Sequence, residues 1–168
     1  MFMKTILKFI AVISMAVLAG CASTTPVAVA PVGPNPNGLP VNSDQGGLQV
    51  FSRLTSVSDD GNQGSKEPGP AWYQHTAYLI FGADGSLVRN VQNQRGHYDQ
   101  DPTLVMLPPG EYRVKAESVD YFWVDVPVTV QRGKVTRLHL DGRWSPPAGT
   151  SSAEVIRMPN GRAVGWKT

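Results

Sequence analysis

The chain has 168 residues, with 15 lysines and arginines against 13 aspartates and glutamates, and it contains one cysteine. Lys4 and Lys8 lie in an N-terminal segment that we expect to be removed, which leaves 13 basic and 13 acidic residues. A surface without net charge is a poor match for polyanions and argues against a nucleic-acid partner. A single cysteine excludes an internal disulfide, so a hydrophobic core must hold the fold.

Residues 1–20 have the three-part layout of a secretory signal peptide. Two lysines form a basic head, residues 9–19 are apolar apart from Ser14, and the small residues Ala19 and Gly20 end the segment. A helix that spans a bilayer needs about 20 apolar residues, and this run is far shorter. The sequence therefore predicts a cleaved signal peptide rather than a transmembrane anchor.

The end of this segment resembles the lipobox of bacterial lipoproteins. Leu18, Ala19, Gly20 and Cys21 carry the resemblance. In that family the cysteine thiol is alkylated with diacylglycerol, the leader is cut just before the cysteine, and the new amine is acylated. The resemblance implies that Cys21 is the lipid attachment site and that acyl chains hold the mature protein on a membrane. Because Ala22 rather than aspartate follows, it also implies the outer membrane, on the periplasmic side.

Residues 21–47 follow the leader, and we expect them to form a flexible tether. Positions 22–47 hold five prolines and four glycines, and Asp44 is their only charge. Such a composition cannot bury enough apolar surface to offset its ordering entropy. The segment would span roughly 30 Å as a coil and roughly 80 Å fully extended, and would hold the folded part away from the membrane.

The chain from 48 to 142 is predicted to form one β-sandwich. Apolar and β-branched residues gather in short stretches that turn residues separate. These stretches cover 48–57, 72–81, 87–92, 103–107, 111–118, 122–131 and 135–140. The turns include Asp84-Gly85 and Pro108-Pro109-Gly110, which are typical of hairpins and sharp reversals.

Three of these stretches alternate between apolar and polar residues, as half-buried strands do. We expect these side chains to face the core: Tyr112, Val114, Ala116 and Ser118; Phe122, Val124, Val126, Val128 and Val130; and Thr136, Leu138 and Leu140. Pro127 falls on the opposite face and removes one hydrogen-bond donor of the ladder. It therefore indicates an edge strand or a bulge.

Residues 143–168 form a linker and then one more hairpin. The linker is rich in proline, glycine and serine, and Asn160-Gly161 is a typical two-residue turn between apolar residues such as Ile156 and Val164. The predicted fold class is all-β: a single antiparallel sandwich of about seven strands plus a C-terminal hairpin, preceded by a signal peptide and a disordered linker.

One phrase of the sandwich resembles carboxypeptidase-regulatory-like domains of the transthyretin-like (prealbumin-like) type. The segment 107–114 reads LPPGEYRV, and the turn Arg132-Gly133-Lys134 precedes a closing strand over 135–140. The match covers roughly 104–142 and implies a transthyretin-like β-sandwich. Such sandwiches serve many functions, so the resemblance implies a fold and no particular activity.

Catalytic motifs are not found in the sequence. It has no G-x-S-x-G, no phosphate loop and no dinucleotide fingerprint. His75, His97 and His139 lie far apart, so a zinc site would have to be assembled in space. His139 alternates outward on its strand and is predicted to lie on the surface.

Two loops have the composition of a metal or acid–base site. His97, Asp99 and Asp101 alternate within 95–101, and in an extended segment they would share one side. A polar loop between strands is the interpretation that we favour there. Residues 59–64 have a calcium-like composition but lack the spacing of an EF-hand loop. We therefore predict no metal site and no cofactor.

Aromatic residues gather near the predicted strand ends, at Trp72, Tyr73, Tyr121, Trp123, Trp144 and Trp166. Exposed rings could stack on sugars or hold a partner, whereas buried rings would close the corners of the sandwich. Burial is the interpretation that we favour, and Trp123 is the exception because it falls on the polar face of its strand.

Together these observations predict a membrane-anchored envelope lipoprotein that acts as a non-catalytic binding or assembly module. Its partners would be the membrane, through the lipid on Cys21, and a protein or polysaccharide of the envelope. A partner strand could add to an exposed sheet edge. One alternative is a metal-dependent or hydrolytic enzyme that uses the 95–101 loop. Another is a glycan-binding module that uses exposed tryptophan and tyrosine rings.

Overall fold

The computed structural model describes residues 27–38, 40–41, 43–57, 72–93 and 101–168. Within these ranges the backbone forms thirteen strands and one 3-10 turn, and it contains no α-helix. The elements are β1 (Val27–Ala28), β2 (Val32–Gly33), β3 (Gly46–Phe51), β4 (Leu54–Val57), β5 (Trp72–His75), β6 (Tyr78–Gly82), β7 (Leu87–Val91), β8 (Leu104–Leu107), β9 (Gly110–Ala116), β10 (Val124–Val130), β11 (Val135–His139), η1 (Ser152–Glu154), β12 (Val155–Arg157) and β13 (Ala163–Lys167).

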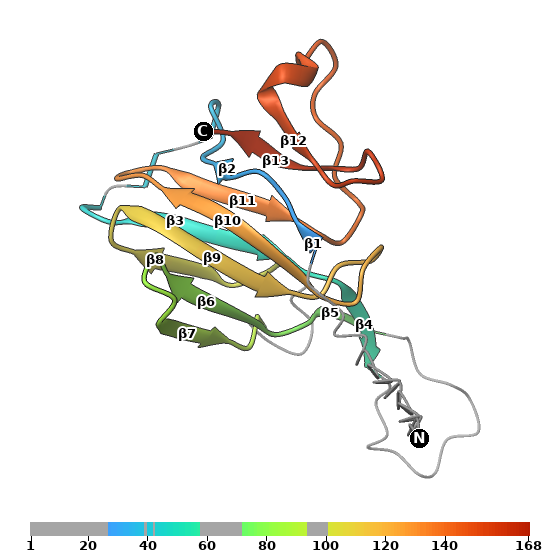
Figure 1. The fold of residues 1–168 in the computed structure, drawn as a ribbon, viewed down its shortest axis with the longest axis horizontal. Coiled ribbons are helices and arrows are strands. Elements are labelled where there is room, and N and C mark those ends of the chain that lie inside the picture. Colours follow the sequence, from blue (N-terminus) through green and yellow to red (C-terminus); the bar gives the residue numbers. More distant parts are fainter. Residues whose placement is uncertain (1–26, 39, 42, 58–71, 94–100) are drawn as a thin grey trace, which may run out of the picture.

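The strands form two sheets that pack face to face, with a short ladder at one end (Figure 1). The larger sheet has the order β12-β13-β2-β10-β9-β6-β7, and β1 also pairs with β10. The second sheet has the order β11-β3-β8, and β4 pairs with β5. One core cluster joins side chains of β6, β9 and β10 to side chains of β3, β8 and β11. The predicted all-β sandwich is therefore confirmed.

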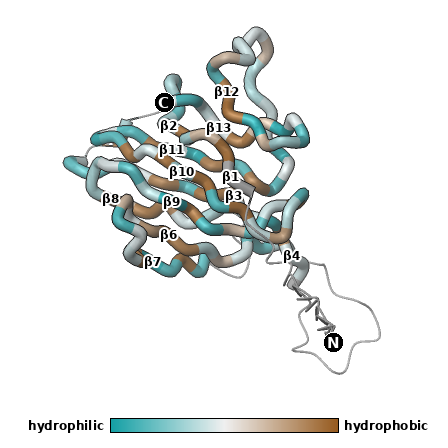
Figure 2. Tube along the Cα trace, in the orientation of Figure 1, coloured by the Kyte–Doolittle hydropathy of each residue, from teal (hydrophilic) through white to brown (hydrophobic). Residues whose placement is uncertain are grey.

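Strict alternation places β10 at the centre of the core. The strand reads VDVPVTV, and each of its four valines is at most 1 % exposed. Asp125, Pro127 and Thr129 lie between them on the opposite, half-buried face. Figure 2 shows the same alternation as bands along the strands of both sheets. Burial of each valine contributes about 1.5–3 kcal/mol to folding, so this strand is a large part of the core.

The N-terminal part of the fold differs from the predicted tether. β1 and β2 run parallel to β10, with Val27 opposite Val124 and Val32 opposite Val128. Val32 is fully buried, and Val29 packs against the core. The prediction of a flexible segment over 21–47 is therefore wrong from residue 27 on. The many prolines led to the prediction of a coil in spite of these valines. Proline is nevertheless compatible with the ends of short strands.

Pro127 lies in the middle of the larger sheet and not on an edge strand. On one side it pairs with Arg113 of β9. On the other side β1 ends at Ala28 and β2 begins at Val32, so the ladder is interrupted opposite Pro127. The interruption removes the need for the hydrogen-bond donor that proline lacks, and this is why proline is tolerated in a central strand.

The C-terminal hairpin extends the larger sheet. β12 pairs with β13, and β13 pairs with β2 through Trp166 opposite Gly33 and Lys167 opposite Val32. A Cβ atom on Gly165 would lie 2.5 Å from a methyl carbon of Val32, so β13 approaches β2 closely only because this residue is glycine. The hairpin is therefore continuous with the sandwich.

Most pairings are antiparallel, as predicted, but β1 and β2 with β10 and β3 with β11 are parallel. A parallel pair cannot be closed by a tight turn. These pairings consequently join segments from opposite ends of the chain. Two predicted strands, 48–57 and 72–81, are each divided in two. The second half of the first, β4, pairs with the first half of the second, β5.

Candidate functional site

Several residues of the predicted sites lie outside the described part of the chain. These are Cys21, His97, Asp99 and the loop 59–64. Asp101 is described and is exposed at the start of the segment that leads to β8. Among the described residues, no group of three histidine, cysteine, aspartate or glutamate side chains could hold a metal ion. The grouping of His97, Asp99 and Asp101 remains a prediction.

A buried polar cluster lies where β3, β5 and β7 end. Ser52, His75 and Asn93 are 0 %, 7 % and 2 % exposed. The Asn93 amide nitrogen donates to the Val50 carbonyl and to Ser52 Oγ, each at 2.9 Å. Its amide oxygen accepts from the backbone nitrogen of Thr103 at 3.1 Å. Asn93 therefore links the end of β3 to the start of the segment that forms β8.

The chemistry of this cluster is structural. A nucleophilic serine donates its hydroxyl hydrogen to a ring nitrogen of a neighbouring histidine. Here Ser52 Oγ donates to the Thr76 carbonyl at 2.6 Å, and His75 Nδ1 lies 2.6 Å from the Ser52 carbonyl oxygen, to which it donates. Hydroxyl and imidazole are thus bound to different carbonyls. The cluster satisfies the backbone where 48–57 and 72–81 divide, and no sequence motif marks it.

A column of aromatic rings crosses the outer face of the smaller sheet. Phe51 stacks on His139 with ring centroids 4.4 Å apart, and His139 stacks on Trp144 at 4.7 Å. Edge-to-face contacts extend the column to His75 at 5.7 Å from Phe51 and to Trp166 at 6.0 Å from Trp144. These rings pack on one another, so their faces are not free to stack on sugars.

His139 is enclosed in this column, and the prediction of a surface position is wrong. It does alternate outward from the core, but Trp144 from the segment after β11 covers that face. Burial, together with smaller electrostatic effects of Arg137 and His75, lowers the pKa of His139 to about 4. The imidazole is consequently neutral near pH 7, which suits a ring packed between two aromatic faces.

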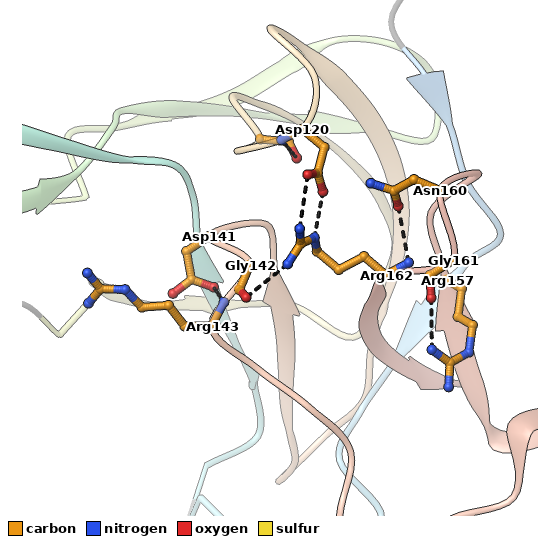
Figure 3. A network of polar contacts seen from close by, with 9 residues as sticks. Asp120, Asp141, Gly142, Arg143, Arg157, Asn160, Gly161 and Arg162 are labelled. Carbon is orange, nitrogen blue, oxygen red and sulfur yellow. Dashed lines mark hydrogen bonds and ion pairs between the residues drawn. The ribbon is translucent and has the colours of Figure 1, made fainter.

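A network of polar contacts joins the C-terminal hairpin to two loops (Figure 3). The Arg162 guanidinium binds both carboxylate oxygens of Asp120, at 2.6 and 3.1 Å. Its third contact is to the Gly142 carbonyl at 3.0 Å. The hydrogen bonds from Arg162 hold the pKa of Asp120 below its usual range. Arg162 thereby fixes the hairpin turn against the 117–123 loop and the segment after β11.

A shallow groove of about 230 Å³ lies on the outer face of the larger sheet. Its lining residues are Pro31, Ala83, Glu111, Tyr112, Arg113, Pro127, Val128 and Thr129. Small-molecule sites usually measure about 300–1,000 Å³. The Arg113 guanidinium is already bound to the Asp125 carboxylate, so the groove offers little free charge to a ligand.

The strand β7 is an edge strand with an unusual apolar surface. It is the last strand of the larger sheet, and four of its five residues are exposed. Leu87 is 57 % and Val88 is 45 % exposed. The register with β6 shifts here, because Ile80 lies opposite Arg89 and Phe81 lies opposite Leu87, so Leu87 and Val88 form an irregularity of the ladder. The hairpin turn at Asp84-Gly85 predicted a returning strand over 87–92, but its edge position depends on the sheet order and could not be read from the sequence.

The loop 117–123 between β9 and β10 carries a second apolar surface. Val119 is 51 % and Phe122 is 66 % exposed. The prediction that Phe122 faces the core is wrong, because β10 begins only at Val124 and the alternation does not extend into the loop. Trp123 is half-buried, with Lys115 Nζ 6.0 Å from its ring. Tyr121 packs against the core.

In the described ranges no helix has the length and apolar character needed to cross a bilayer. Comparisons with family models, with curated proteins and with solved structures found no match to this chain.

Proposed function

We propose that the protein is an outer-membrane lipoprotein of the bacterial envelope, held through lipid on Cys21 and facing the periplasm. Its folded part acts as a non-catalytic binding or assembly module of transthyretin-like type. The lipobox-like residues Leu18 to Cys21 support the anchor, and the all-β sandwich is compatible with the resemblance over 104–142.

The observation that carries the binding role is the exposed edge of β7. Edge strands present unpaired backbone groups, and proteins usually protect them with charges, prolines or covering elements. Here Leu87 and Val88 leave apolar side chains exposed on the edge strand. A partner segment in extended conformation would gain backbone hydrogen bonds and apolar contacts there. Arg89 is also exposed and would favour an acidic residue in that segment.

Site-specific crosslinking in the bacterial envelope tests this role. A photoreactive amino acid at position 88 should give a discrete crosslinked product, whereas the same group at the exposed Thr55 on β4 should not. Leu87→Lys should remove the product, because a charge on the edge opposes strand addition. The binding role is refuted if position 88 gives no product or if the product survives Leu87→Lys.

The anchor has its own test. Mass spectrometry of the protein purified from envelopes should show diacylglycerol and an acyl group on Cys21, with the first 20 residues absent. Cys21→Ser should abolish both changes and release the protein from the membrane fraction. An unmodified Cys21 thiol in the native protein is incompatible with the proposed anchor.

A further inference from the structure

The chain joins the larger sheet at the end that carries the loop 117–123. Val27 is the first residue of β1, and it pairs in parallel with Val124, the first residue of β10. Val124 in turn pairs with Ala116, the last residue of β9. β1 therefore begins at the same end of the sheet as β10, and Figure 1 shows β1 beside the β9–β10 connection.

The distance from the proposed anchor to this loop is short. Cys21 and Val27 are six residues apart, and six residues span at most about 20 Å when fully extended. The sheet begins at residue 27, so the folded part cannot be held far from the membrane by the longer segment 21–47. The end of the sandwich nearest β1 must lie close to the bilayer surface.

The loop is suited to a membrane interface. Phe122 and Val119 are the exposed apolar residues, and they flank Tyr121 and precede Trp123. Aromatic side chains favour the interface between headgroups and acyl chains. Exposed apolar residues at this end would otherwise remain in water, where they contribute nothing to the core.

The acidic side chains of the loop are neutralised by partners. Asp120 is bound by both arms of the Arg162 guanidinium, and Glu117 lies 3.8 Å from Arg53. Neutralised carboxylates are less costly to bring near lipid than free ones. The loop is also well held, because Val119 donates its backbone N–H to the Leu140 carbonyl at 2.9 Å.

We propose that the loop 117–123 docks into the bilayer interface through Phe122 and Val119, as a second membrane contact beside the lipid. The contact fixes the orientation of the sandwich relative to the membrane. This inference rests on the proposed lipid anchor at Cys21. The partner of the exposed apolar side chains is a phospholipid surface. The short segment between Cys21 and Val27 would keep the loop within reach of that surface.

A fluorescence experiment on the full-length protein tests the docking. The protein is purified from envelopes in detergent and reconstituted into vesicles of phosphatidylethanolamine and phosphatidylglycerol. Lipidation consumes the only native cysteine, so the Phe122→Cys variant offers a single thiol for an environment-sensitive fluorophore. On reconstitution its emission should shift to the blue and gain intensity, and lipids brominated in the acyl chains should quench it.

The matched control is Leu87→Cys, since Leu87 is 57 % exposed against 66 % for Phe122 but lies on β7. Its fluorophore should show neither the shift nor the quenching. Thermal unfolding must give the same midpoint for both labelled variants, and Val119→Cys replaces Phe122→Cys if that variant does not fold.

Sedimentation with the vesicles separates the two proposals. A variant that sediments but shows no change at position 122, or the same change at positions 122 and 87, overturns the docking and leaves the anchor intact. Protein that fails to sediment and retains a free thiol at Cys21 overturns the anchor itself, together with the docking that depends on it.

Discussion

Asn93 shows how much of this fold depends on single polar residues. Its φ of 54° lies in the left-handed region, which asparagine tolerates better than most residues. Its side chain bonds to the Val50 carbonyl, Ser52 Oγ and the Thr103 N–H, all within the protein interior. Asn93 thus provides hydrogen-bond partners for backbone groups near the point where two predicted strands are divided.

Asn93→Ala should lower the free energy of unfolding by about 3 kcal/mol. The substitution leaves several buried groups without partners, each at a cost of about 1–3 kcal/mol, part of which relaxation recovers. Asn90→Ala on the exposed face of β7 is the control and should change stability by less than about 0.5 kcal/mol. Urea denaturation measures both, and equal stability of the two variants would contradict the structural role of Asn93.

His139 predicts a loss of stability in acid. Its pKa is about 4 in the fold, against an ordinary value of 6.5, so below pH 6.5 the unfolded chain binds a proton that the folded chain does not. The contribution of neutral His139 to the free energy of unfolding is therefore fully present above pH 6.5. It is lost as the pH drops toward 4, by at most about 3 kcal/mol. His139→Phe should flatten the dependence of unfolding free energy on pH in this window. An unchanged slope would contradict the enclosed position of the ring.

At the scale of elements, the strands that alternate strictly are those that the sequence predicts well. β10 and β11 lie within the predicted stretches, β9 begins one residue before its stretch, and the valines of β10 face inward as expected. Alternation fails at Phe122, where the strand has not yet begun. It holds at His139, but the predicted surface position fails because another segment covers the outer face of the ring. Val32 was missed because the prolines around it suggested a coil. Long-range covering and pairing are tertiary effects that local pattern does not encode.

Of the candidate surfaces, the sequence predicts residue types but not their placement. It indicates a strand at 87–92 and aromatic residues at 121–123, yet it cannot show that β7 is an edge strand. It equally cannot show that residue 27 pairs with residue 124, at the end of the sheet that carries the 117–123 loop.

The Arg162 contacts predict the behaviour of the C-terminal hairpin. Arg162→Leu removes the bonds to Asp120 and to the Gly142 carbonyl, so β12 should open locally. Hydrogen exchange should become faster in residues 155–157 while the core strands keep their protection. Arg157→Ala is the control, because the Arg157 guanidinium donates to the Gly161 carbonyl within the same hairpin. Unchanged exchange at 155–157 in Arg162→Leu would count against the network.

For the whole molecule, β2 is the seam between the sandwich core and the C-terminal hairpin. Deletion of residues 27–34 removes the buried Val32 and the strand that joins β10 to β13. The deletion should remove several kcal/mol of unfolding free energy, and each kcal/mol corresponds to about 2–4 °C in the thermal midpoint. We therefore expect the midpoint to fall by about 10 °C or more. Val32→Ala should give part of this loss and the exposed Val88→Ala almost none. A midpoint unchanged by the deletion would show that residues 27–34 are dispensable.

The position of β2 between β10 and β13 would also set the order of events in the export that we propose. A polypeptide that crosses a membrane with its N-terminus first presents β2 early, but both of its neighbours arrive only near the end of translocation. β2 cannot pair with both neighbours while the chain is only partly exported. The exported part would therefore stay incompletely folded until then. Under the proposed export, closure would coincide with the arrival of the last residues, after the whole polypeptide has crossed the membrane.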